Sequence, residues 1–239
     1  MSEFWITKIE PGYYDHALRS GRLSNKSPQS AWHNKTFTKI ANLIKKDDFL
    51  LDFACGPGTF TGQYLDLNKK PICVDISEQQ INYAKNIYKE KANYMTINEF
   101  DFKDYHNKFD KITCLGLFEF ISKEEGIELL DNFYKLLKPN GKLYLTTPNF
   151  KVSMKFLEFF LNKFGSLDYS QEYKARYTKK TFSKLLFKSS FKIEICEKYM
   201  TPMIFMSIFG NGIGSSLDNY FEKVSKNLYG YLLLFGLKK

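Results

Sequence analysis

A glycine-containing turn directly after a buried apolar segment is the feature that most constrains the fold of this chain. Residues Phe49 to Ala54 have the pattern of a buried strand, and this strand leads into Gly56-Pro57-Gly58. Residues 59–67 then have the pattern of a helix. Glycine lets the backbone approach another molecule closely, and the amide groups at the start of a helix point outward from it. A strand, a glycine turn and a helix in this order are typical of the first unit of a parallel α/β sheet.

The same alternation of short apolar runs and amphipathic stretches continues along the chain, which predicts stacked βα units. We expect further strands at 71–75, 94–97, 111–115, 142–147, 191–197 and 229–237. We expect helices at 29–46, 152–164 and 178–188, another that Ser77 caps, and one that begins with the Ser122 capping box and continues to Leu137.

An acidic residue at the end of the second strand indicates the kind of ligand. Asp75 stands seventeen residues after Gly58, where a carboxylate accepts hydrogen bonds from both hydroxyls of a ribose. A dinucleotide site needs a third glycine at the position of Thr61, and Asp52 ahead of the turn would repel a pyrophosphate. The same acid favours an ammonium group. The sequence therefore predicts a nucleoside-containing ligand with an amino-acid part, and argues against a nicotinamide oxidoreductase.

Five motifs between about residues 49 and 148 resemble those of the class I S-adenosylmethionine-dependent methyltransferases. They are Asp52-x-x-Cys55-Gly56-x-Gly58, Val74-Asp75-Ile76-Ser77, Asp101-Phe102, Cys114 to Ile121, and Leu136 to Gly141 with Asn140 in place of the usual glycine. The resemblance implies a Rossmann-like, seven-stranded, mostly parallel α/β sheet with helices on both faces and a helical cap. It divides the chain into an N-terminal lid or helical segment at 1–46, a cofactor-binding core at 47–150, and cap helices with completing strands of the same domain at 151–239.

The resemblance also implies S-adenosyl-L-methionine as the cofactor, with no metal ion. The expected cofactor contacts are Tyr14, Asp52, Ala54, Gly56, Gly58, Asp75, Ile76, Asp101, Phe102 and Leu115. Ordinary packing stays open for Tyr14, and for Asp101 a role as the cap of the short segment that follows it.

Two residues are candidates for the chemistry of methyl transfer. Glu119 lies in the segment that lines the transfer site in related enzymes. In many of them a histidine follows this glutamate, but here that position is occupied by Phe120. His33 reaches the site if the N-terminal helix forms a lid. Ordinary roles stay open for both residues, since Glu119 also suits the start of a helix and His33 the surface of one.

The acceptor is expected to be a small, partly hydrophobic molecule that is methylated on oxygen or nitrogen by in-line displacement. No Pro-Pro-aromatic tetrapeptide follows the fourth strand, which argues against methylation of the amino groups of adenine or glutamine. No Pro-Cys pair is present, which argues against methylation of cytosine at carbon 5. An RNA or protein methyltransferase and a non-catalytic cofactor-binding subunit remain alternatives.

The composition favours a soluble, cytoplasmic protein. The formal charge is +9, but only Arg19, Arg22 and Arg176 are arginines and the lysines are scattered, which argues against a nucleic-acid surface. The four cysteines are widely spaced, as in reduced proteins. No apolar run is long enough to span a membrane, although the apolar stripe at 152–164 leaves a peripheral membrane contact open. The oligomeric state is not predicted.

Overall fold

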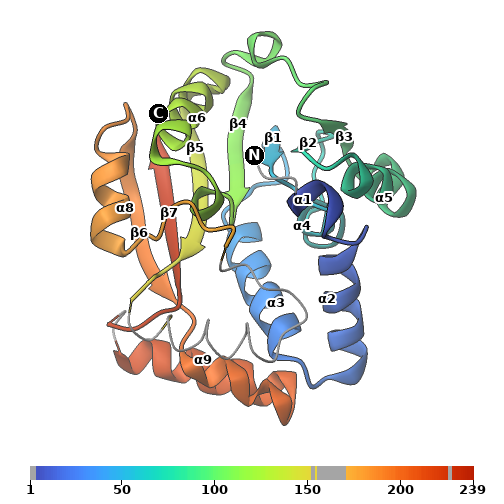
Figure 1. The fold of residues 1–239 in the computed structure, drawn as a ribbon, viewed down its shortest axis with the longest axis vertical. Helices are drawn as coiled ribbons and strands as arrows, with labels where there is room; N and C mark the ends of the chain where they lie inside the picture. Colours follow the sequence, from blue (N-terminus) through green and yellow to red (C-terminus); the bar gives the residue numbers. More distant parts are fainter. Residues whose placement is uncertain (1–3, 152–153, 155–170, 226–227) are drawn as a thin grey trace.

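The chain folds around one seven-stranded sheet, seen in Figure 1. The computed structural model describes residues 4–151, 154, 171–225 and 228–239, so the helix expected at 152–164 lies outside the described residues except for Met154. The strands, in the order β3-β2-β1-β4-β5-β7-β6, are β1 (Leu50–Phe53), β2 (Ile72–Asp75), β3 (Asn93–Thr96), β4 (Phe109–Leu115), β5 (Leu137–Pro148), β6 (Lys192–Tyr199) and β7 (Leu232–Lys238).

The sheet is parallel except at β7, which is antiparallel to both β5 and β6. β1 is buried along its whole length, as expected of a central parallel strand that is covered on both faces. The predicted seven-stranded, mostly parallel sheet is thus confirmed, and the strand at 229–237 is the one that runs against the others.

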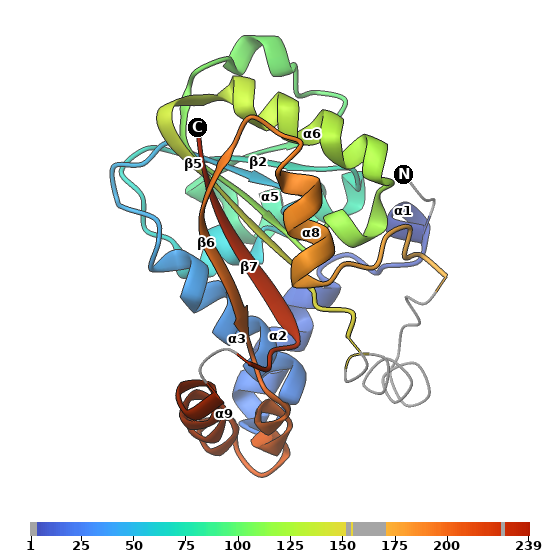
Figure 2. The same ribbon diagram turned by 90° about the vertical axis from the view of Figure 1, so that its left-hand side faces the viewer.

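Helices cover both faces of the sheet, as Figures 1 and 2 show. On one face α6 (Lys123–Leu136) and α8 (Lys179–Leu186) pack into the larger core. On the other face lie α3 (Pro28–Ala41), α4 (Thr59–Tyr64) and α5 (Glu78–Tyr88). The predicted capping box begins α6, because the Ser122 hydroxyl accepts from Glu125 N at 3.1 Å and the Glu125 carboxylate accepts from Ser122 N at 2.7 Å.

Two long helices that the periodicity did not predict lie near the carboxyl ends of the parallel strands. They are α2 (Tyr13–Ser24) and α9 (Asn211–Ser225). The shorter helical segments are α1 (Phe4–Thr7), η1 (Lys89–Lys91), η2 (Phe102–Tyr105), η3 (Phe118–Phe120) and η4 (Pro202–Ile208). Of the described helices, none is long and apolar enough to cross a membrane.

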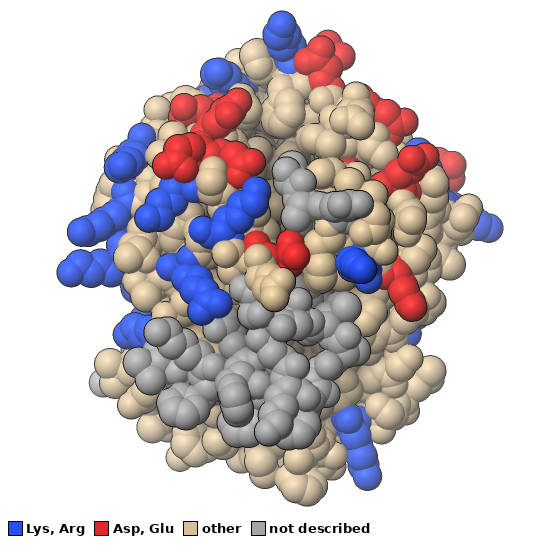
Figure 3. Space-filling model, viewed as in Figure 1, with Lys and Arg blue, Asp and Glu red and all other residues tan. Residues whose placement is uncertain are grey.

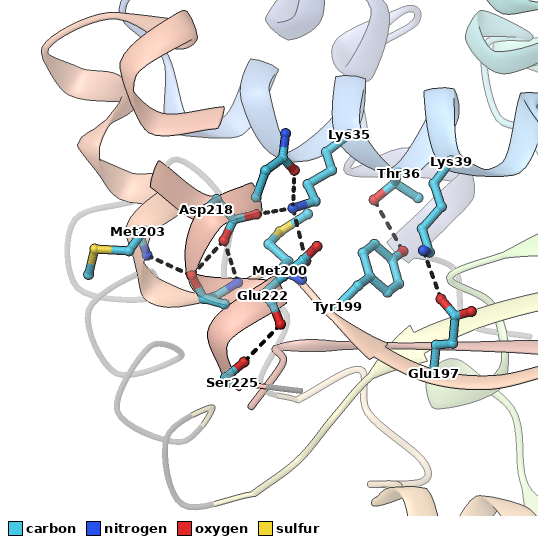
Figure 4. A network of polar contacts seen from close by, with 12 residues as sticks. Lys35, Thr36, Lys39, Glu197, Tyr199, Met200, Met203, Asp218, Glu222 and Ser225 are labelled. Carbon is cyan, nitrogen blue, oxygen red and sulfur yellow. Dashed lines mark hydrogen bonds and ion pairs between the residues drawn. The ribbon is translucent and has the colours of Figure 1, made fainter. Parts of the chain in front are cut away.

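A network of polar contacts holds α9 to α3 (Figure 4). The Lys35 ammonium pairs with the fully buried Asp218 and, at 2.9 Å, with Glu222 Oε1. Beside this cluster the Tyr199 hydroxyl donates to Thr36 Oγ1 at 3.2 Å. Because α3 is fixed from this side, the side chains on its other face have defined positions over the end of the sheet.

Candidate cofactor and acceptor site

A cavity of about 510 Å³ opens at the carboxyl ends of the parallel strands. It is lined by the last residues of β1, β2, β4 and β5 and by side chains of α2 and α3. The order of the strands reverses at β1, whose neighbours are β2 and β4. In an open α/β sheet this reversal creates the crevice in which ligands bind.

The turn after β1 is wound in the left-handed region of backbone space. Ala54, Gly56 and Gly58 have φ angles of +61°, +53° and +72°. A Cβ at Gly58 would lie 2.7 Å from a Tyr94 ring carbon, whereas a Cβ at Gly56 would meet no atom within 4 Å. Gly58 therefore serves close packing under the turn, while Gly56 keeps an open surface on the cavity.

Asp75 connects the two loops at this edge of the sheet. Its Oδ2 accepts from Gly56 N at 2.8 Å, and its Oδ1 accepts from Ser77 N at 2.9 Å. Burial raises the pKa of Asp75, and these backbone hydrogen bonds act against that rise. Each oxygen keeps a second lone pair, and Asp75 lines the cavity, so the carboxylate is placed to accept a pair of hydroxyl groups.

Asp52 is held below the glycine turn by two threonine hydroxyls. Thr61 donates to its Oδ2 at 2.9 Å and Thr113 donates to its Oδ1 at 2.8 Å. The side chain is 2% exposed, and this burial raises its pKa to about 6 in spite of the two hydrogen bonds. Thr61, at the position of the missing third glycine, thus has the role of orienting this acid.

The N-terminal segment is fixed over the glycine turn through a buried carboxylate on α2. Asp15 has no exposed surface, and its two oxygens accept hydrogen bonds from Arg19, Thr59, Gln63, Tyr83 and Tyr88. Gly12 N donates to Gln80 Oε1 at 2.9 Å in the same region. These contacts place the neighbouring Tyr14 on the wall of the cavity.

Glu119 and His33 line the other half of the cavity. Glu119 is 3% exposed, and burial raises its pKa to about 7. Burial lowers the pKa of His33 to about 4, so this imidazole is neutral at pH 7. Its ring centroid lies 5.7 Å from that of Tyr14 and 5.8 Å from that of Phe37. Of the two candidates, only Glu119 changes its charge near neutral pH.

The structure brings most of the predicted site residues together. The cavity is lined by Tyr14, His33, Asp52, Ala54, Gly56, Asp75, Ile76, Leu115 and Glu119. Gly58, Asp101 and Phe102 are not among its lining residues. Asp101 is exposed and its Oδ1 accepts from Lys103 N at 2.9 Å, so that it caps η2. Ile97, the residue that follows β3, lines the cavity on this side.

Much of the acceptor half consists of residues that the sequence did not single out. They come from segments far apart in the chain: Trp5, Gln29, Trp32, Thr36, Thr147, Met154, Tyr173 and Phe205. No local motif connects them, and two sequence patterns gave a signal for part of the set: the amphipathic pattern of 29–46, and the apolar stripe at 152–164, which contains Met154 and could line an acceptor pocket. Within the described residues, no group of three or more His, Cys, Asp or Glu side chains is placed to hold a metal ion.

Comparisons with known proteins agree with this architecture. Residues 50–141 match the model of a family described as a methyltransferase domain. The fold is similar to that of magnesium protoporphyrin IX methyltransferase from Synechocystis PCC 6803 with bound SAH, at a TM-score of 0.59 and 16% identity. The match covers 88% of this chain and 84% of that chain. The expected class I methyltransferase fold is therefore confirmed.

Similarity in sequence extends over a shorter stretch. A demethylmenaquinone methyltransferase of Lactobacillus johnsonii is 26% identical over 58% of this chain and 57% of its own length. A tRNA N(3)-methylcytidine methyltransferase of Schizosaccharomyces pombe is 27% identical over 46% of this chain and 40% of its own length. The chain spans about half the length of the curated relatives it matches.

Proposed function

Given that residues 50–141 form a methyltransferase domain within the class I S-adenosylmethionine-dependent fold, we propose that this chain is a methyltransferase. It moves a methyl group from S-adenosylmethionine to an oxygen or nitrogen of a small, partly hydrophobic acceptor. The observation that carries the proposal is the position of Asp75. It lines the cavity at the end of β2, and its carboxylate accepts a hydrogen bond from Gly56 N of the glycine turn.

The residues present fit this cofactor. Asp75 is placed to accept hydrogen bonds from the ribose hydroxyls, and Gly56 leaves open space beside the turn for the amino-acid part. Asp52, with both oxygens oriented by threonines, supplies negative charge beneath the ammonium group. Tyr14, Ala54, Ile76 and Leu115 complete the walls of this half. When bound, S-adenosylmethionine supplies an electrophilic methyl group on a sulfonium.

The contribution of the protein to the rate is chiefly positioning. Displacement requires that the acceptor lone pair lies in line with the methyl group, in a place from which water is excluded. α2 and α3 cover the ends of the strands, and aromatic side chains line the acceptor half. Glu119, with a pKa of about 7, is the group that can take a proton from the acceptor at neutral pH.

An RNA acceptor is a second candidate, favoured by exposed lysines on α8 and directly after it. Lys180 and Lys184 lie on α8, Lys188 follows its end at the same spacing of four residues, and in Figure 3 many blue side chains lie on the side that carries α8. A steep decrease of RNA binding with salt concentration would support this candidate, and weak binding without salt dependence would dismiss it.

The proposal is tested by equilibrium binding of S-adenosylhomocysteine to the wild type and to Asp75→Ala. We expect micromolar binding by the wild type and loss of binding by the variant, while the circular dichroism spectrum and the unfolding midpoint stay close to those of the wild type. Asp131→Ala, on the exposed side of α6, is the matched control. A folded Asp75→Ala protein that binds as the wild type does would contradict the ribose assignment.

A further inference from the structure

The charge of the cavity differs sharply from the charge of the whole chain. The protein has a formal charge of +9, yet no Lys or Arg is found among the described residues that line the cavity. Three carboxylates do line it, those of Asp52, Asp75 and Glu119. The site as a whole therefore favours positively charged ligands over negatively charged ones.

Two of these carboxylates belong to the cofactor half and have their own partners. Asp52 accepts from two threonine hydroxyls, and Asp75 accepts from two backbone amides. The third is different, because Glu119 Oε2 is buried and makes no hydrogen bond to any described residue. Burial has the larger effect on the pKa of this carboxyl and raises it, while the Thr147 hydroxyl and the Glu119 backbone amide act to lower it. A buried carboxylate oxygen without a hydrogen bond is unfavourable unless a ligand provides one. Glu119 Oε2 therefore lacks a positively charged or hydrogen-bonding partner among the described residues.

A cluster of three aromatic rings lines the same cavity as Glu119. The Phe120 ring centroid lies 4.7 Å from that of Trp5 and 5.3 Å from that of Tyr173, and all three rings line the cavity. The backbone keeps this group together, since the Glu119 carbonyl accepts from Lys174 N at 2.9 Å, next to Tyr173. A cavity that contains both aromatic rings and a carboxylate attracts an organic cation.

We propose that the acceptor is a primary or secondary amine on an apolar scaffold, whose ammonium group pairs with Glu119 among the rings of Trp5, Phe120 and Tyr173. This inference rests on the proposed methyl transfer and narrows it to nitrogen. The same carboxylates disfavour an anionic acceptor, and a neutral alcohol offers no positive charge to an ionised Glu119.

The reaction balances with the groups named. The ammonium gives one proton to the Glu119 carboxylate, which frees the nitrogen lone pair. That lone pair forms the new N–C bond to the methyl group, while the S–CH₃ bond of the sulfonium breaks and its electron pair stays on sulfur. The products are S-adenosylhomocysteine and a methylated ammonium, and the proton on Glu119 passes to solvent.

The test compares isosteric probes by ligand-observed NMR with protein saturated with S-adenosylhomocysteine. The probes are 2-phenylethylamine, the neutral 2-phenylethanol and the anionic phenylacetate. We expect the amine to bind about ten- to a hundredfold more tightly than the alcohol, as is typical of hydrogen bonds to a charged partner. Glu119→Gln should remove most of this difference. Glu128→Gln, on the exposed side of α6, should keep it.

The outcomes separate this inference from the proposed function. If S-adenosylhomocysteine binds, three results would overturn the amine assignment. They are binding of the alcohol as tightly as the amine, binding of neither probe, and an unchanged preference for the amine in Glu119→Gln. Failure of S-adenosylhomocysteine to bind would overturn the proposed function instead. In that case the same titrations without S-adenosylhomocysteine decide whether the cavity prefers the amine to the alcohol. If Glu119→Gln does not fold, the comparison of the three probes on the wild type decides the same question.

Discussion

The substitution Asp15→Asn tests whether one buried carboxylate fixes the N-terminal helix over the glycine turn. Asp15 is fully buried on α2 and accepts hydrogen bonds from donors on α2, α4 and α5. The hydrogen bonds and the Arg19 guanidinium hold the pKa of Asp15 below its usual value although burial acts to raise it. The carboxylate is therefore ionised at neutral pH, and an amide of the same shape removes only the charge and one acceptor.

The expected loss follows from the donors that the amide cannot satisfy. Oδ2 accepts from Arg19 Nε and from the Tyr83 hydroxyl, both at 2.8 Å. An NH₂ group at this position can donate to the Tyr83 hydroxyl. It cannot accept from the Arg19 N–H, however, so two donors then face each other. A hydrogen bond to a charged group contributes about 1.5–3 kcal/mol, and the remaining donors then bind a neutral oxygen. We expect the free energy of unfolding to fall by about 2–4 kcal/mol.

Urea unfolding followed by circular dichroism measures this change, and calorimetry with S-adenosylhomocysteine measures its effect on the site. Affinity should fall as well, because Asp15 is bonded to Thr59 at the start of α4 and stands next to Tyr14. Asp131→Asn, on the surface of α6, serves as the control, and Tyr83→Phe should cost about 1 kcal/mol. A loss below about 1 kcal/mol in Asp15→Asn would refute the reasoning that these hydrogen bonds fix α2.

Three further comparisons test the packing and the ionisation of the site. In urea unfolding, Gly58→Ala should destabilise the chain by about 1–3 kcal/mol more than Gly56→Ala does, because only at Gly58 does the new methyl group overlap an aromatic ring. Equal losses of stability in the two variants would contradict this packing. Thr113→Val removes a hydrogen-bond donor from the buried Asp52, whose pKa is about 6. We therefore expect the free energy of unfolding to fall by about 1–3 kcal/mol at pH 8, where Asp52 is ionised, and by less at pH 5. A loss of stability that is independent of pH would show that Asp52 does not ionise in this range. Burial raises the pKa of Glu119 from 4.5 to about 7, so the folded state binds the proton more tightly and the wild type should lose up to ~3 kcal/mol of stability relative to Glu119→Gln as the pH rises from 4.5 to 8. A constant difference between wild type and Glu119→Gln over this range would show that Glu119 titrates normally.

The sheet was predictable because its strands are short apolar runs that end in recognisable turns. The helices α2 and α9 were not predictable from apolar periodicity, because many of their buried residues are polar or have small side chains. α2 buries Asp15, Leu18 and Gly21, and α9 buries Gly214 and Asp218 while large apolar side chains face outward. Apolar periodicity cannot detect a helix whose inward face consists of a buried carboxylate and a glycine.

The cofactor half of the site was predictable for a similar reason. Asp52, Gly56 and Asp75 lie at the ends of strands that the pattern already placed side by side, so their proximity follows from the topology. The acceptor half was not predictable, since Trp5 and Tyr173 meet Phe120, the neighbour of Glu119, only through tertiary contacts between the two flanks of the chain.

The central claim is that the cavity binds S-adenosylmethionine, and calorimetric titration of the wild type with S-adenosylhomocysteine tests it most directly, with NADH as the parallel control. The account predicts micromolar binding of S-adenosylhomocysteine with a stoichiometry near one and no binding of NADH. The acid at Asp52 and the threonine at position 61 are the reason for this selectivity. Binding of NADH, or of neither molecule, would contradict the account.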